Sequence, residues 1–238
     1  MNLHTILFTA AVAGFSLSAF PQEKTLTGAQ EAFAKLDRAL NESYQKAKAI
    51  LPEHLFEQVR EEQRDWIAYR DQRAATAARL DGGAGEGKEK ANPEYWNALA
   101  YLTETRIEIL KAWTRIDQFP KTWEGAWIDG YGGILLIAED ETGNLAFTCS
   151  AVRGASYHLG NIAGTAAANQ STARFSTTVE GEEKETWLTF LQESDGRLRI
   201  IGENTESFHG ARAYFDGRYL RVRELTEEDR EEIADPGF

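Results

Sequence analysis

The sequence predicts an α+β protein, in which an antiparallel three-helix domain precedes a separate antiparallel β-meander or barrel of seven or eight strands. Apolar residues recur at steps of three and four through the first half, which is the period of amphipathic helices. After residue 121, short runs of β-branched and aromatic residues alternate with turn sequences, which is typical of strands joined by hairpins. We therefore expect a helical domain at residues 24–118 and a β-domain at residues 122–223, each packed around its own core.

The first predicted helix begins near Thr27, which forms a plausible capping box with Gln30. Its apolar stripe consists of Leu36, Leu40, Tyr44, Ala47 and Leu51. Pro52 then interrupts the pattern. Because proline is tolerated only in the first turn of a helix, a second helix should begin near this residue and continue to Leu80.

A glycine-rich segment at residues 82–87 separates the second and third predicted helices. Four glycines in six positions cannot stay helical, because each costs roughly 1 kcal/mol against alanine. Asn92 and Pro93 then indicate an N-cap followed by proline in the first helical position, so a third helix should run from there to Trp113. Three such helices with short connections should pack antiparallel around one apolar seam.

The β-domain contains seven predicted strands in sequence. They lie near residues 134–137, 145–151, 157–162, 173–179, 186–192, 198–202 and 219–222. The segments between several of them, such as 141–144 and 194–196, suit tight hairpins. A meander of this size removes its exposed edges most simply by closing into a barrel. The pattern Trp123-x-Gly125-x-Trp127 opens the first strand and resembles the Gly-x-Trp start of lipocalin-type barrels.

Both ends of the chain differ from the two domains. Residues 6–19 form an apolar stretch that is too short to span a bilayer and that fits the core of a secretory signal at residues 1–19. A helix packed on the protein is the alternative. Residues 224–238 form an acidic tail, which we expect to be a frayed helix or a solvated segment. These features predict a periplasmic or secreted protein with no membrane span.

The formal charge of −12 lies almost entirely in the second half of the chain. Residues 1–121 carry 16 Lys and Arg against 17 Asp and Glu, whereas residues 122–238 carry 10 against 21. Such a half repels a phosphate backbone, so we expect no nucleic acid partner, whereas a cationic protein would be attracted to it. Solubility is a second explanation for the acidity.

Three segments of the helical half carry a family resemblance. They are Leu36-Asp37-x-x-Leu40-Asn41-x-x-Tyr44, Gln63-Arg64-x-Trp66-Ile67-x-Tyr69-Arg70-Asp71 and Leu102-Thr103-x-x-Arg106-x-x-x-Leu110. In this order and spacing they resemble the N-terminal domain of the LprI-like lysozyme inhibitor family, over about residues 28–113. The resemblance implies an exported protein that binds lysozyme, a strongly basic glycosidase.

The chain departs from the family at two positions. It has Ala74 and Ala98 where many members of the family have cysteines, so both partners of the bridge that the resemblance implies are missing together. Because no disulfide constrains this helical hairpin, its stability must come from packing.

Two groups of residues are candidates for a binding site. Trp66, Tyr69 and Arg70 fall at helical spacing, so they can face Thr103 and Arg106 across the helical hairpin. They form either a binding face or an aromatic seam in which Arg70, Asp71 and Arg106 make a charge network that fixes the helix register. The second group is His209, Arg212 and Tyr214, in a segment rich in aromatic residues, Arg and Gly. That mixture is favoured at protein interfaces, although the segment could also be a loop that caps the barrel.

The sequence shows no motif of catalysis, cofactor binding or metal binding. Cys149 lies in a predicted strand and should be a small core residue rather than a nucleophile. We therefore expect a protein without cofactor or metal, which is not an enzyme.

The leading hypothesis is an exported envelope protein that binds another macromolecule, with lysozyme inhibition as the form that the resemblance implies. A cationic protein such as lysozyme would be the partner. A carrier that holds a small apolar ligand inside the barrel is the alternative, since eight-stranded barrels can hold one. A structural envelope factor is a third possibility.

Overall fold

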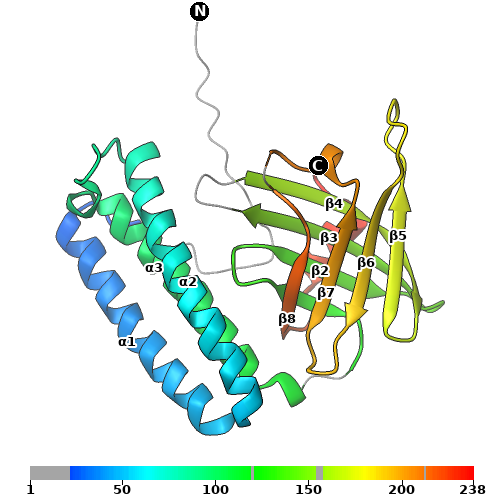
Figure 1. Cartoon of the computed structure of the whole chain (residues 1–238), viewed down its shortest axis with the longest axis horizontal. Coiled ribbons are helices and arrows are strands. Elements are labelled where there is room, and N and C mark those ends of the chain that lie inside the picture. Colours follow the sequence, from blue (N-terminus) through cyan, green and yellow to red (C-terminus); the bar gives the residue numbers. More distant parts are fainter. Residues whose placement is uncertain (1–21, 119–120, 154–157, 212) are drawn as a thin grey trace, which may run out of the picture.

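A helical region and a β-barrel lie side by side in the computed structural model (Figure 1). The structure describes residues 22–118, 121–153, 158–211 and 213–238. The predicted signal at residues 1–19 and the candidate Arg212 lie outside the described residues. Helices are followed by an eight-stranded closed antiparallel barrel, which confirms the predicted α+β class and the meander.

The long helices are α1 (Leu26–Ile50), α2 (Glu53–Leu80) and α3 (Pro93–Trp113), and α3 packs along both of the others. Helix α2 begins next to Pro52, which is its N-cap, and Asn92 is the predicted N-cap of α3. The Asn92 side chain accepts a hydrogen bond from the amide of Glu94. The predicted cap at Thr27 is wrong. Thr25 caps α1 by accepting from the amide of Gly28, so Thr27 already lies within the first turn.

The strands follow one another around the barrel. They are β1 (Gly125–Ile128), β2 (Ile134–Glu139), β3 (Asn144–Arg153), β4 (His158–Asn169), β5 (Thr172–Thr177), β6 (Thr186–Gln192), β7 (Leu198–Glu203) and β8 (Gly217–Arg223). Each pairs antiparallel with the next, and β8 pairs with β1 to close the barrel. Single 3-10 turns lie at Glu89–Ala91, Ile116–Gln118 and Glu206–Phe208. Strand β4 continues well beyond its predicted end and turns at Gln170, which has a positive φ of 55°.

The interior of the barrel is filled by aromatic side chains. The ring of Phe147 packs edge-on against Phe175 and Phe190, with ring centroids 5.1 and 5.0 Å apart. The Phe175 ring lies directly over Gly164, where an added Cβ would be 2.2 Å from it. Tyr219 is fully buried in the same cluster. The barrel therefore has its own close-packed core.

A second apolar cluster joins the helices to the outside of the barrel. It combines residues of the helices, among them Val59, Trp66 and Leu110, with Ile128 of β1 and Leu220 of β8. The expectation of two separately packed cores is therefore wrong for the helices. The physical reason is that β1 is apolar on both faces, one facing the barrel interior and one facing α3.

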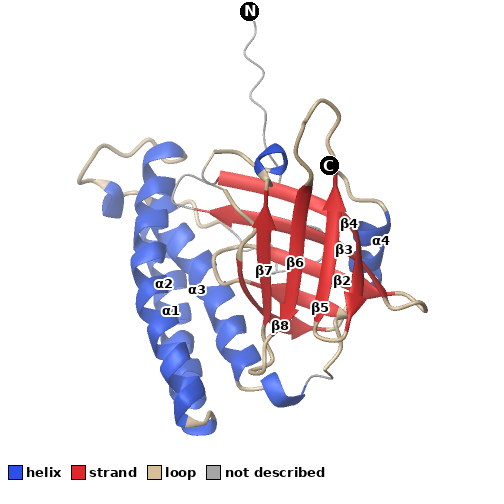
Figure 2. Cartoon of the chain, turned by 45° about the vertical axis from the view of Figure 1, so that its right-hand side comes forward, coloured by secondary structure: helices blue, strands red, loops and turns tan. Residues whose placement is uncertain are grey.

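The acidic C-terminal stretch forms a short helix, α4 (Glu227–Ala234), which packs against β2 and β3 on the outer face of the sheet (Figure 2). Its capping box is reciprocal, because Thr226 and Asp229 each accept from the backbone of the other. Asp229 is fully buried and forms an ion pair with Arg223. Residues 227–234 are therefore ordered, and of the two predicted forms the helix is the one observed.

Candidate binding site

A groove lies where α2 meets the turn between β6 and β7. We call it the junction groove; its volume is about 540 Å³. Gln58, Glu61, Glu62 and Asp65 of α2 line one wall, and Glu193, Ser194, Asp195, Arg197 and Arg218 line the other. The four α2 residues recur at helical spacing, which places them on one face. Five carboxylates against two guanidinium groups leave the groove with a net charge of −3.

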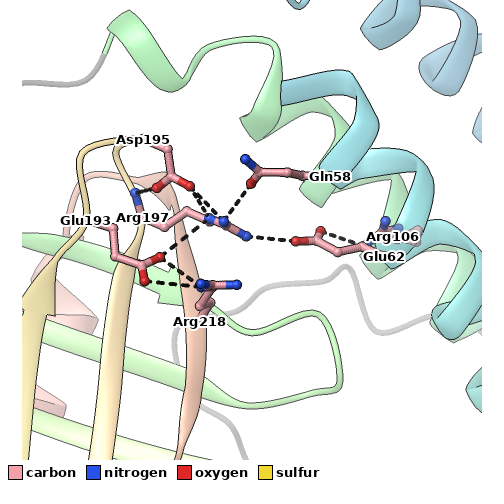
Figure 3. A network of polar contacts seen from close by, with 7 residues as sticks. All are labelled: Gln58, Glu62, Arg106, Glu193, Asp195, Arg197 and Arg218. Atoms are coloured by element: carbon pink, nitrogen blue, oxygen red, sulfur yellow. Dashed lines mark hydrogen bonds and ion pairs between the residues drawn. The ribbon is translucent and has the colours of Figure 1, made fainter. Parts of the chain in front are cut away.

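Arg197 connects the two walls of the groove (Figure 3). Its guanidinium donates to Glu62 of α2 over 3.0 Å, to Gln58 over 2.6 Å and to Asp195 of its own hairpin over 2.7 and 2.9 Å. The group also lies over the ring of Trp113, 5.2 Å from a centroid, and its side chain is only 7% exposed. Arg197 therefore fixes the position of α2 relative to the β6–β7 hairpin.

Arg197 lowers the pKa of one neighbouring carboxyl group, that of Asp195. Burial alone would raise the pKa of Asp195, but hydrogen bonds from the side chain and amide of Arg197 outweigh it and lower the pKa. Glu193 forms an ion pair of 2.9 Å with Arg218, whose side chain is about half exposed. Two further carboxylates of the groove, those of Glu61 and Asp65, are exposed.

A second cavity, the inner cleft, lies next to the groove and shares Glu62, Arg197 and Arg218 with it. Its volume is about 280 Å³, and it brings together three of the predicted candidates: Trp66 and Arg106 from the helices and Tyr214 from the loop before β8. Tyr131, which follows β1, adds another aromatic wall. These residues are far apart in the sequence, and the docking of the helices on the barrel unites them.

One wall of the inner cleft is built around a buried ion pair of Asp129 and Arg153. Asp129 also accepts hydrogen bonds of 2.8 Å from the amides of Tyr131 and Gly133, which fix the turn between β1 and β2. Burial alone would lower the pKa of Arg153, but the Asp129 carboxylate raises it overall, so the guanidinium stays charged. The ring of Tyr214 lies over this guanidinium at 4.7 Å, while half of the tyrosine side chain remains exposed.

Arg106 lies at the helical wall of the cleft and is 3% exposed. Its Nε donates to Gln63 over 2.8 Å, and its Nη1 faces Glu62 at 3.9 Å. Its Nη2 is buried and has no hydrogen-bond partner among the described residues. Burial lowers the pKa of Arg106, partly offset by Glu62. This guanidinium therefore has an unused donor beside the cleft.

A comparison with known protein families finds a match for the helical part of the chain. Residues 19–110 match the model of the family described as lysozyme inhibitor LprI. The helical region is LprI-like. This confirms the resemblance seen in the three helical segments, and the match covers less than half of the chain and ends before the barrel. Neither the curated proteins nor the solved structures contain a match to the chain.

Tyr69 and Arg70, the other two candidate binding residues of the LprI-like region, do not line the inner cleft. Tyr69 donates from its hydroxyl to the carbonyl of Tyr131 over 2.7 Å and packs edge-on against that ring. Arg70 pairs with its neighbour Asp71 on α2 over 2.9 Å and approaches Asp37 of α1 at 4.0 Å. Its guanidinium lies 5.1 Å from the Trp66 ring. The predicted network of Arg70, Asp71 and Arg106 is therefore split, since Arg106 contacts other partners.

His209 does not line the inner cleft, whereas Tyr214 does. Its Nε2 lies 3.0 Å from the hydroxyl of Thr205, and its Nδ1 lies 3.0 Å from the carbonyl of Gly210. Its backbone forms a bridge with Gly160 of β4, at a shallow groove that does not include the inner cleft. Part of the segment after η3 (Glu206–Phe208) thus attaches to β4.

Several residues of the site were missed in the sequence. Arg153 is the last residue of β3 and Arg197 directly precedes β7, and neither gives a sign in the sequence of its distant partner. Asp129 gives a weak signal, because it opens a turn with three glycines at positions 130, 132 and 133, two of which have positive φ. Such a turn needs a side chain that accepts from its amides, and Asp is suited to this role.

The described residues contain no group of three or more His, Cys, Asp or Glu side chains placed to hold a metal ion. Cys149 is buried in the barrel core, and burial raises the pKa of its thiol to about 12. A thiol in this state is not a nucleophile at neutral pH. Within the part of the chain that is described, no helix is both long and apolar enough to cross a bilayer.

Proposed function

We propose that the protein binds a basic protein through the junction groove, with lysozyme as the specific target, and that it acts by contact rather than by catalysis. The single observation that carries this proposal is the match of residues 19–110 to the lysozyme inhibitor family, because these residues supply the acidic helical wall.

Charge supports a cationic partner. The groove has a net charge of −3 within a chain of net charge −12, so both the local and the long-range field attract a basic protein. The carboxylates of Glu61 and Asp65 are exposed, whereas Glu62 is already paired with Arg197. The two exposed groups are therefore free to meet basic side chains of the partner.

Export belongs to the same proposal. The resemblance to the family implies an exported protein, and the apolar residues 6–19 would serve as its signal. A periplasmic or secreted location would bring the protein to the compartment in which lysozyme acts.

The filled barrel favours protein binding over the carrier alternative. A carrier needs an apolar cavity for its ligand, but Phe147, Phe190 and Tyr219 occupy the interior of this barrel and are almost completely buried. The barrel thus acts in our proposal as a rigid support for the hairpin that completes the groove.

Removal of the exposed groove charges tests the proposal. We expect hen-type lysozyme to bind the wild type in calorimetric titration at low salt, and the double variant Glu61→Gln/Asp65→Asn to bind about tenfold more weakly, because charge complementarity is lost. The double variant should inhibit lysozyme less in a cell-wall lysis assay.

The matched control is Glu180→Gln/Glu183→Gln. It removes the same charge from exposed positions in the connection between β5 and β6, away from the groove (Figure 1). Equal weakening by both double variants would assign the effect to net charge alone and would contradict the groove as the site. Absence of binding by the wild type would contradict lysozyme as the target.

A further inference from the structure

The inner cleft adjoins the junction groove but is lined by a different set of charges. Four guanidinium groups line it, those of Arg106, Arg153, Arg197 and Arg218. Three carboxylates oppose them, those of Glu62, Asp129 and Asp216. Arg197 and Arg218 are also paired with carboxylates outside this lining, those of Asp195 and Glu193.

Arg106 is the arginine of the lining whose hydrogen-bond donors are not all satisfied. Arg153 is matched by Asp129, and Arg197 by Asp195 and Glu62, but the Nη2 of Arg106 is buried without a hydrogen-bond partner among the described residues. A buried charged donor without an acceptor costs free energy, and an arginine fork matches the geometry of a carboxylate. Glu62 does not satisfy Nη2, because its Oε2 lies 3.9 Å from Nη1 of Arg106 and its Oε1 accepts from Arg197.

We propose that the inner cleft binds a small organic monocarboxylate, with its carboxylate on Arg106 and its organic part against Tyr131 and Tyr214. One carboxylate supplies the acceptor that Nη2 of Arg106 lacks, whereas a dianion such as phosphate brings a second negative charge close to Glu62, Asp129 and Asp216.

The size of the cleft agrees with a small ligand. Its volume of about 280 Å³ is close to the lower limit of ordinary ligand pockets, about 300 Å³, and several times the roughly 30 Å³ that a water molecule occupies in the liquid. The cleft therefore accepts a ring-sized molecule but not a long chain. Aromatic walls on two sides favour a ligand with a flat or ring-shaped body.

Calorimetric titration with four probes tests this proposal. We expect D-glucuronate to bind, acetate to bind more weakly because it lacks the organic part, and inorganic phosphate to bind no better than acetate. D-glucose, which has the ring without the carboxylate, should give no saturable heat. Equal binding of glucose and glucuronate would contradict the role of the carboxylate, and no binding by glucuronate or acetate would overturn the proposal.

Variants locate the site. Arg106→Gln should weaken glucuronate binding at least about tenfold, because a hydrogen bond to a charged group is lost. Tyr214→Ala changes a half-exposed residue and should weaken glucuronate binding several-fold. If the Arg106 variant fails to fold, the Tyr214 variant tests the proposal by itself. The control Arg199→Gln removes an exposed charge from β7 outside the cleft and should leave the affinity unchanged. Unchanged binding in both cleft variants would overturn the proposal.

Discussion

At the scale of single residues, Arg197 has the most consequences, because it contacts both parts of the chain. It is paired with Asp195 of its own hairpin and with Glu62 and Gln58 of α2, and it covers Trp113 of α3. A charged group with so little exposure is stable only when its donors are satisfied. Its loss removes several hydrogen bonds at once.

We predict that Arg197→Ala lowers the free energy of unfolding by about 1–3 kcal/mol, since partly buried acceptors lose their charged donor. Urea unfolding measures this difference. The control Arg218→Ala removes a guanidinium of the same network that is about half exposed, and it should cost less than about 1 kcal/mol. A loss as large for Arg218 as for Arg197 would contradict the role given to the buried group.

Sequence patterns could identify candidate residues but not their neighbours. Helical spacing singled out Trp66, Tyr69, Arg70 and Arg106, yet only the first and last line the inner cleft. The docking of the helices on the barrel decides this, and no periodicity within either half encodes it. For the same reason Tyr214 could be selected by its type, whereas its position over Arg153 could not.

At the scale of elements, the start of a helix was predictable where a proline or a capping residue determines it. Pro52 and the pair Asn92 and Pro93 begin helices because proline limits where a helix can start. Strand β4 was predicted too short, because its second half from Ala163 to Asn169 consists of small and polar residues with weak strand preference. Its pairing with β3 determines its length instead.

Helix α4 gives a prediction that depends on pH. Burial alone would raise the pKa of Asp229, but hydrogen bonds from Arg223 and Thr226 lower it overall from its ordinary value of 3.8. A lowered pKa means that the charged form stabilises the fold; this contribution is complete above the ordinary value and is lost as the pH falls through the lowered one.

We therefore expect Asp229→Asn to lower the free energy of unfolding by about 1 kcal/mol or more at pH 7, as for the loss of a helix cap. The difference from the wild type should shrink below pH 3.8, the ordinary value for Asp. Urea unfolding at pH 7 and at pH 3 measures both values. Glu228→Gln, an exposed change in the same helical turn, is the control. A difference that stays constant with pH would contradict the assignment to the carboxylate.

At the scale of the whole molecule, one apolar cluster contains residues of both the helices and the barrel, so the two parts do not have fully separate cores. The order of helices and barrel follows from the change of pattern after residue 121. The apolar outer face of β1 and β8 could have indicated that something covers them, but it does not say that the covering elements are α2 and α3. Because these helices cover that face, the LprI-like region and the barrel together form the acidic groove.

The central claim is that this acidic surface binds a basic protein by charge complementarity. Titration of the wild-type protein with hen-type lysozyme at about 10 mM and about 500 mM salt tests it most directly, since screening lengths fall from about 30 Å to a few ångströms over this range. We predict tight binding at low salt that weakens strongly at high salt. Absence of binding at low salt, where attraction between opposite charges is strongest, would contradict the claim.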